Sequence, residues 1–187
     1  MDIRDAQREV RSVYIGGFWG QIVSSIIWLV SAALGTWVSP KASILTALIT
    51  GFFIFPLTQM MLRLSGRPAR VSKENPLHWL GMQVAFVLPL SMLLLVPVCN
   101  YNWNLFFPAL MILLGAHYLP FATLYGMRTF LFLAGILMTA GVVVALYFLA
   151  TFSIGAWVAG VTLFVFAWIL RSIAVGEARV QVVSAGN

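Results

Sequence analysis

Four long stretches of this chain contain no Asp, Glu, Lys or Arg, and they constrain its fold more than any other feature. They cover residues 12–40, 42–62, 75–127 and 129–170. A helix needs about 20 apolar residues to cross a hydrocarbon core that is about 30 Å thick. The first two stretches therefore predict one membrane span each. The last two are too long for one helix and too short for three, so each predicts a hairpin of two spans.

The composition excludes a soluble globule. Of 187 residues, 61% are hydrophobic and only 9% are charged, whereas a soluble domain carries about 25% charged residues. Most soluble-enzyme classes are excluded with it. The seven Trp residues suit a protein that meets two membrane–water interfaces. The single cysteine, Cys99, excludes an intramolecular disulfide and a metal site built from cysteines.

Turn signals divide the two predicted hairpins. Three Asn residues lie among interfacial aromatics in the segment 99–104, and the weaker signal 151–155 lies at the right distance from both ends of its stretch. We therefore predict an all-α, polytopic bundle of six transmembrane helices. The predicted spans are 13–37, 42–62, 78–98, 105–126, 129–150 and 154–174, preceded by a cytoplasmic amphipathic segment 1–12 and followed by a cytoplasmic tail 175–187.

A cleaved signal peptide is the alternative for the first span, because Ser31, Ala32 and Ala33 are small residues. The apolar run before them is longer than the usual region of about 7–15 residues, and the N-terminus carries acidic residues. These features favour a retained span.

The distribution of basic residues predicts the orientation. With six spans, every Lys and Arg except Lys41 falls on the side of the two termini. Short cytoplasmic loops carry the excess of basic residues in membrane proteins, so we expect both termini in the cytoplasm. An odd number of spans would place the two basic termini on opposite sides. The basic residues are scattered in short membrane-proximal segments, which does not favour a nucleic-acid partner.

The linker after the second span holds Arg63, Arg67, Arg70 and Lys73. These residues act as topology determinants, or they additionally hold anionic lipid headgroups at about 1 kcal/mol per basic residue.

The N-terminal segment has the pattern of a short amphipathic helix. Asp2 is placed to cap it, Asp5 lies in its first turn, and apolar residues follow at helical spacing. It lies at the interface, runs directly into the first span, or forms a solvated cap without a partner.

Small residues at four-residue spacing indicate close helix packing. Gly16, Gly20 and Ser24 form such a series in the first span, and Gly135 and Gly155 begin shorter ones in the last two. In lipid, helices associate largely through close backbone approach, which small residues allow. The series serves packing within the chain or forms the seam of a homodimer.

Prolines predict kinks in three consecutive spans, at Pro56, Pro89 and Pro120. Each lacks an amide donor and frees the carbonyl four residues earlier, on Phe52, Ala85 and Ala116.

Polar side chains within the spans gather in the first four helices. No Asp, Glu, Lys or Arg lies at depth, which argues against proton pumping and cation transport. The candidate pocket residues are Gln21, Ser24, Thr58, Gln59, Gln83, His117, Thr123 and Tyr125. They line a pocket open to the cytoplasm, or they form interhelical hydrogen bonds of about 0.6 kcal/mol each. His117, near the predicted bilayer centre, is a neutral hydrogen-bonding imidazole or a proton carrier.

The sequence contains no convincing catalytic or metal-binding pattern. The two histidines have no acid or thiol partner in the membrane, no serine lies in a nucleophile motif, and the glycines at 16–20 are flanked by Trp and Phe within an apolar helix. We expect no metal, no cofactor and no catalytic residue.

Several motifs resemble those of a family of small bacterial multi-spanning membrane proteins that has no assigned function. These motifs are Gly16–Gln21, Trp28–Leu34, Phe55–Gln59, Gly66–Pro68, Asn75–Leu77 and Gly115–Phe121. The resemblance covers most of the chain and implies a multi-pass protein of the bacterial cytoplasmic (inner) membrane. It implies no activity and gives no residue a role.

Two functional hypotheses follow. The protein binds or transports a small neutral or weakly polar molecule, or a lipid, through a cytoplasm-facing pocket. Alternatively, it is a structural or regulatory membrane protein that acts through helix contacts with a partner and transports nothing. Membrane lipids are expected partners in both cases, and the identity of a small-molecule ligand is not indicated.

The predicted topology can be tested with reporter fusions. A reporter fused after Asn187 should be active only in the cytoplasm, and one inserted at Asn102 only on the outside, because an even number of spans returns both termini to the basic side. Cytoplasmic activity of the Asn102 fusion would contradict six spans.

Overall fold

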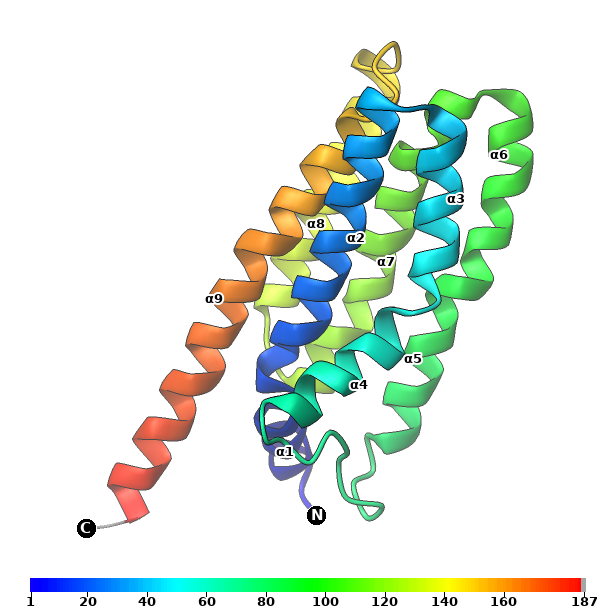
Figure 1. The fold of residues 1–187 in the computed structure, drawn as a ribbon. Coiled ribbons are helices and arrows are strands. Elements are labelled where there is room, and N and C mark those ends of the chain that lie inside the picture. The colour runs from blue at the N-terminus through cyan, green and yellow to red at the C-terminus, as the bar shows by residue number, and fades with distance from the viewer. Residues whose placement is uncertain (186–187) are drawn as a thin grey trace.

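The structure is a computed structural model that describes residues 1–185, and it is a bundle of helices (Figure 1). No β-strand occurs within this range. Five helical segments are long and apolar enough to cross a membrane, and a bent pair of helices makes a sixth if it is counted as one span. The predicted all-α class is confirmed, and so is a bundle of several apolar spans.

The helices have these bounds in chain order: α1 (Ile3–Tyr14), α2 (Phe18–Trp37), α3 (Pro40–Gly51), α4 (Ile54–Leu64), α5 (His78–Ser91), α6 (Leu95–Tyr101), α7 (Phe106–Tyr125), α8 (Thr129–Tyr147) and α9 (Ile154–Ala185). Short 3-10 turns at Ile15–Gly17, Met92–Leu94 and Trp103–Leu105 separate α1 from α2, α5 from α6, and α6 from α7.

Two helical regions differ from the predicted spans. The predicted span 42–62 is the pair α3 and α4, which are bent by 57° relative to each other. Helix α9 continues to Ala185, so the segment predicted as a tail, 175–187, is helical as far as the structure describes it. No proline interrupts that segment, which allows the helix to continue beyond its apolar part. Residues 186–187 lie outside the described residues.

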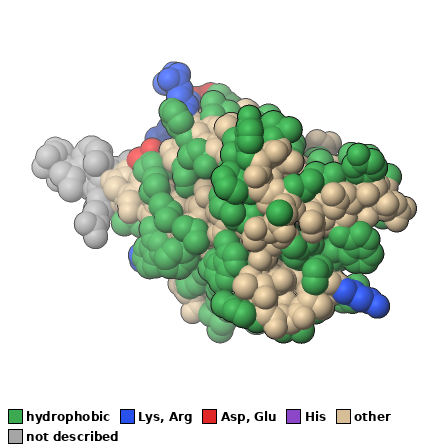
Figure 2. Space-filling view, turned by 90° about the horizontal axis from the view of Figure 1, so that it is seen from above, with side chains coloured by type: hydrophobic (Ala, Val, Ile, Leu, Met, Phe, Trp, Pro, Cys, Tyr) green, Lys and Arg blue, Asp and Glu red, His purple; other side chains and the backbone are tan. Residues whose placement is uncertain are grey.

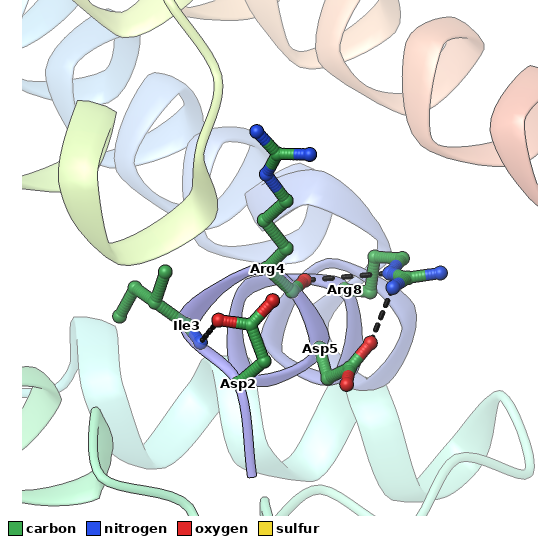
Figure 3. Close-up of polar contacts among 5 residues, drawn as sticks. All are labelled: Asp2, Ile3, Arg4, Asp5 and Arg8. Carbon is green, nitrogen blue, oxygen red and sulfur yellow. Dashed lines mark hydrogen bonds and ion pairs between the residues drawn. The ribbon is translucent and has the colours of Figure 1, made fainter.

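Helix α1 is polar on one side and buried on the other. Asp2 caps its start by accepting a hydrogen bond from the Ile3 amide at 2.6 Å, and the Arg8 guanidinium pairs with Asp5 (Figure 3). On the opposite side of α1, Ala6, Val10 and Val13 are buried. The helix therefore packs against the bundle and is not a solvated cap without a partner.

A sharp break separates α1 from α2. Ile15, Gly16 and Gly17 all have positive φ angles, of 52°, 63° and 88°. A Cβ at Gly16 would lie 2.8 Å from the Leu170 carbonyl oxygen of α9, so this position requires glycine for both conformation and space. Consequently α1 does not run straight into the first span.

The prolines act differently at their three positions. Pro56 lies in the first turn of α4, directly after the break at residues 52–53 where the predicted span bends by 57°. Pro89 lies near the end of α5, shortly before the turn Met92–Leu94. Pro120 lies inside α7, which runs without interruption from Phe106 to Tyr125.

Two helix pairs form the tightly packed part of the bundle, α2 with α9 and α7 with α8. Between α2 and α9, the Ser25 hydroxyl donates to the Gly160 carbonyl at 2.9 Å. Between α7 and α8, a Cβ at Gly141 would lie 2.8 Å from the Pro108 carbonyl oxygen. Close backbone approach is the contact expected between helices in lipid.

Helices α5 and α6 lie at the edge of the bundle (Figure 1). Only Val84 on α5 and Leu95 on α6 are buried, whereas Phe86 is 60% exposed and Val96 is 61% exposed. Large apolar side chains on an outer helix surface are stable in hydrocarbon and unfavourable in water. The bundle is thus that of a multi-pass integral membrane protein.

The basic residues gather at one end of the bundle. This end carries α1, the connection from α4 to α5, and the start of α8, whereas Lys41 lies near the other end, at the start of α3 (Figure 1). The end that carries Lys41 shows many hydrophobic side chains and few charged ones (Figure 2).

Two helix glycines allow a matched test of the α7–α8 contact. A Cβ at Gly115 would lie 2.8 Å from the Ala134 carbonyl oxygen, whereas nothing lies within 4 Å of one at Gly135. We expect Gly115→Ala to destabilise the protein by about 1–3 kcal/mol through overpacking. Gly135→Ala should be neutral or stabilising by up to about 1 kcal/mol, because alanine favours the helix. Thermal unfolding in detergent measures both, and equal shifts would contradict the contact.

Candidate binding cavity

The described part of the bundle contains a cavity of about 550 Å³ between α2, α4, α5 and α7. Residues on both sides of the α3–α4 bend line it, among them Gly51, Phe52 and Phe55. The bend turns α4 away from the axis of α3 (Figure 1).

Six of the eight predicted pocket residues line this cavity. They are Gln21, Ser24, Thr58, Gln59, His117 and Tyr125. The other two, Gln83 on α5 and Thr123 on α7, are exposed on other helix faces. The inward positions of α5 are Gly81 and Ala85, and a helical period of 3.6 residues turns Gln83 away from them.

Buried polar groups from α2 and α7 meet at the cavity wall. The Tyr118 hydroxyl donates to Gln21 Oε1 at 3.4 Å, and Ser24 lies beside the same hydroxyl. Gln21 and Ser24 are each only 3% exposed. Nearby, His117 Nδ1 is buried and has no hydrogen-bond partner within the described residues.

Aromatic rings from α7 and α8 form one side of the cavity. The Phe121 and Tyr125 rings stack with their centroids 5.7 Å apart, and Phe130 lies 5.1 Å from Tyr125. The His117 ring packs edge-on against Phe121 at 5.1 Å. The sequence analysis gave Tyr118, Phe121 and Phe130 no role in a pocket, because aromatic residues at helical spacing are common in any helix core.

The cavity lining contains no Asp, Glu, Lys or Arg among the residues that the structure describes. Its hydrogen-bonding side chains include amides, hydroxyls and the imidazoles of His78 and His117. The rest of the wall is aliphatic or aromatic, with Trp28, Leu110 and Leu114 at the buried side. Such a site suits a ligand without net charge.

Helix α1 and the α4–α5 connection close the cavity at the basic end. Val10 and Tyr14 of α1 line it there, together with Val71 and Leu77 of the connection. We call these four residues the cavity floor.

Polar contacts hold the floor in place. The Glu9 carboxylate accepts hydrogen bonds from the Ser72 amide at 2.6 Å and from Asn75 Nδ2 at 2.8 Å. Gln7 Nε2 donates to the Thr123 carbonyl at 2.7 Å, and Arg11 contacts both the Tyr125 carbonyl and the Glu177 carboxylate. These bonds tie α1 to the connection, to the end of α7 and to α9.

Asn75 is a structural residue that the sequence analysis named only as part of a family motif, without a role. It is 2% exposed, and its Oδ1 accepts from the Leu77 amide at 2.9 Å while its Nδ2 donates to the Ala6 carbonyl at 3.1 Å. The Asn-Pro sequence signals a turn, but the contact to Ala6 depends on tertiary structure.

The four basic residues at the end of α4 and in the α4–α5 connection do not enter the cavity. Arg63, Arg67, Arg70 and Lys73 are all exposed, so they are free to meet headgroups or water.

The predicted packing residues fall into two groups. A Cβ would be crowded at Gly16 by α9 and at Gly155 by Phe107 Cβ at 3.1 Å. At Gly20 it would meet only Thr58, at an ordinary 3.8 Å, because Gly20 borders the cavity. Gly135 borders open space. Close backbone packing is therefore not found at Gly20 or Gly135.

No group of three or more His, Cys, Asp or Glu residues that could hold a metal ion occurs within the part of the chain that was described.

The apolar bundle and its cavity define the class, a multi-pass membrane protein with an internal uncharged cavity. The chain belongs to a family of unknown function, DUF7010, whose model matches residues 3–172. This confirms the resemblance to a family without an assigned function. No curated protein and no solved structure matches the chain.

The Glu9 contacts predict a pH dependence of stability. Partial burial by itself would raise the pKa of the Glu9 carboxyl, but hydrogen bonds from Ser72 and Asn75 lower it below the ordinary 4.5. The folded state therefore binds this proton less readily than the unfolded state, so the stabilisation is present above pH 4.5 and is lost as pH falls through the folded pKa. Glu9→Gln should cost about 1 kcal/mol at pH 7, and its difference from wild type should shrink below pH 4.5.

Thermal unfolding in detergent between pH 7 and pH 3.5 measures the stability difference between wild type and Glu9→Gln. The matched control is Glu74→Gln, which removes an exposed carboxylate from the same connection. Parallel curves for wild type and Glu9→Gln would contradict the role of Glu9.

Proposed function

We propose that this protein binds an uncharged amphiphilic molecule in the cavity between α2, α4, α5 and α7. The observation that carries the proposal is the buried His117 Nδ1, which lacks a partner in the described structure and borders a cavity with no charged lining residue.

An unpaired buried nitrogen is unfavourable in an apolar wall. Leaving a buried donor or acceptor unsatisfied costs about 1–3 kcal/mol. A hydroxyl or amide of a bound molecule would remove this cost, because a neutral imidazole nitrogen either donates or accepts. A ligand with a polar, uncharged head is therefore favoured at His117.

Further hydrogen-bonding groups are available beside it. Thr58 and Gln59 lie on α4, across the cavity from the α7 side, and Gln21 lies on α2. Pro56 and Pro89 cannot donate to the carbonyls of Phe52 and Ala85, and both of these residues also line the cavity. Such carbonyls would accept from a hydroxylated head.

Because most side chains that line the cavity are apolar, a large part of the ligand must be apolar as well. The cavity volume of about 550 Å³ falls within the range of about 300–1,000 Å³ that is usual for small-molecule sites. A charged ligand is disfavoured, because a charge buried near the bilayer centre without a counter-ion is costly.

We further propose that the cavity lies in the cytoplasmic half of a bacterial inner membrane, with both termini in the cytoplasm. The gathering of basic residues at the end that carries α1 supports this orientation. Arg63, Arg67, Arg70 and Lys73 would then lie among anionic headgroups.

The experiment uses tritiated monooleoylglycerol as the uncharged probe and oleate as its charged counterpart, with purified protein in detergent. We expect saturable binding of monooleoylglycerol and at least tenfold weaker binding of oleate. Gly20→Phe places a ring at the cavity wall and should weaken monooleoylglycerol binding at least tenfold.

The matched control is Gly135→Phe, because a side chain at Gly135 meets open space. This variant should bind as wild type does, and thermal unfolding should show that both variants are folded. Unchanged binding by a folded Gly20→Phe, or equal binding of oleate, would contradict the proposal.

A further inference from the structure

Four phenylalanine and methionine residues line the cavity and are also exposed on the outside of the bundle, as is Pro56. The four are Phe52 and Phe55 at the α3–α4 bend, and Met82 and Phe86 on α5. Their exposed fractions are 64%, 54%, 40% and 60%. A side chain that meets both an inner cavity and the outer surface marks an opening, so the cavity reaches the outside between α4 and α5. We call these four residues the lateral mouth.

The lateral mouth lies in the apolar part of the bundle. Its four side chains carry no hydrogen-bonding group and belong to helical segments with the hydropathy of membrane spans. An opening lined by phenylalanine and methionine at this depth faces lipid chains and not water.

The end of the cavity toward the basic residues is closed by contrast. The cavity floor of Val10, Tyr14, Val71 and Leu77 lies there, and the hydrogen bonds of Glu9 with Ser72 and Asn75 hold its two segments together. A molecule coming from the aqueous side would have to separate α1 from the α4–α5 connection.

Helix α5 has little that holds it against α4. Its one buried residue is Val84, and it packs mainly on α7, on the other side of the cavity. Pro89 also removes one backbone hydrogen bond from this helix. The mouth is therefore bordered by the least tightly packed span.

We propose that the ligand is an uncharged single-chain lipid that enters the cavity sideways from the bilayer, between α4 and α5. The inference rests on the proposed function and adds both the ligand class and the route. The head lies against His117 and Gln21, and the acyl chain extends through the lateral mouth into the surrounding hydrocarbon. The acyl chain of the lipid then stays in an apolar environment throughout entry. The uncharged head is the only polar group that moves through the lateral mouth.

The test links the two edges of the mouth covalently. In a Cys99→Ser background, Phe55→Cys and Phe86→Cys are joined by a flexible bismaleimide, and the protein is placed in phosphatidylcholine nanodiscs. The probe is monooleoylglycerol with a diazirine near its head, supplied from vesicles. Photolysis at successive times measures labelling of the peptide that contains His117.

We expect the linked mouth to slow labelling at least tenfold relative to the same variant before linking. Protein loaded with the probe and then linked should retain it, which shows that the link blocks the route and leaves the site intact.

The matched control links the cavity floor. Glu9→Cys and Ser72→Cys, in the same background, are joined by the same reagent, since the Glu9 carboxylate and the Ser72 hydroxyl are 3.1 Å apart. This link replaces the hydrogen bonds that the two substitutions remove, so the linked protein should be labelled at the same rate as the Cys99→Ser protein, whose floor is intact.

The outcomes separate the route from the site. Unchanged labelling with a linked mouth, or slowed labelling with a linked floor, would overturn lateral access while leaving the proposed binding in place. Absence of labelling at the His117 peptide in the unlinked protein would overturn the proposed function, and the route with it.

Discussion

Pro56 has no backbone N–H, and in hydrocarbon a missing donor has consequences for the whole region around it. The amide of residue 56 would otherwise bond to the Phe52 carbonyl. The chain instead ends α3 at Gly51 and starts α4 at Ile54, with Pro56 in the first turn, where no amide donor is needed. The resulting bend of 57° separates the course of α4 from that of α3. The cavity and its lateral mouth both border this bend.

Helix α1 closes the cavity at the basic end of the bundle. Its apolar side covers the end of the cavity, and its polar side bonds to the α4–α5 connection, to the end of α7 and to α9. A helix with charged residues is stable at the membrane surface and costly inside the membrane. This segment can therefore close the cavity toward water while leaving its lateral side to the lipid.

The arrangement connects packing with chemistry. The two tightly packed pairs, α2 with α9 and α7 with α8, present Gln21 and His117 on a rigid wall, while α4 and α5 form a loosely packed wall opposite. Polar groups that converge from rigid elements can orient a ligand head. The apolar and loosely packed wall formed by α4 and α5 can admit an acyl chain. The proposed binding of an uncharged lipid would use both properties of the same cavity.

The sequence by itself determined the class of the protein and much of the cavity lining. Charge-free stretches long enough to cross a bilayer leave no alternative to an apolar helical bundle, and polar residues are rare enough in such helices that Gln21, Gln59 and His117 could be selected by type alone. Helix faces could not be selected in the same way. Gln83 and Thr123 share the chemistry of the cavity residues, yet their angular positions on α5 and α7 turn them away from it.

Only the tertiary structure decided which small and aromatic residues matter. Gly16 and Gly20 belong to one four-residue series, but α9 packs against the first and the cavity borders the second. The helix pairing that makes this difference arises from contacts far apart in the chain. The same is true of Asn75, whose side chain reaches Ala6. Local sequence specifies which helices form and where they break, because those are properties of the backbone and of neighbouring residues. The cavity exists because of how the helices are placed around the bend, and this placement depends on the packing of the whole bundle.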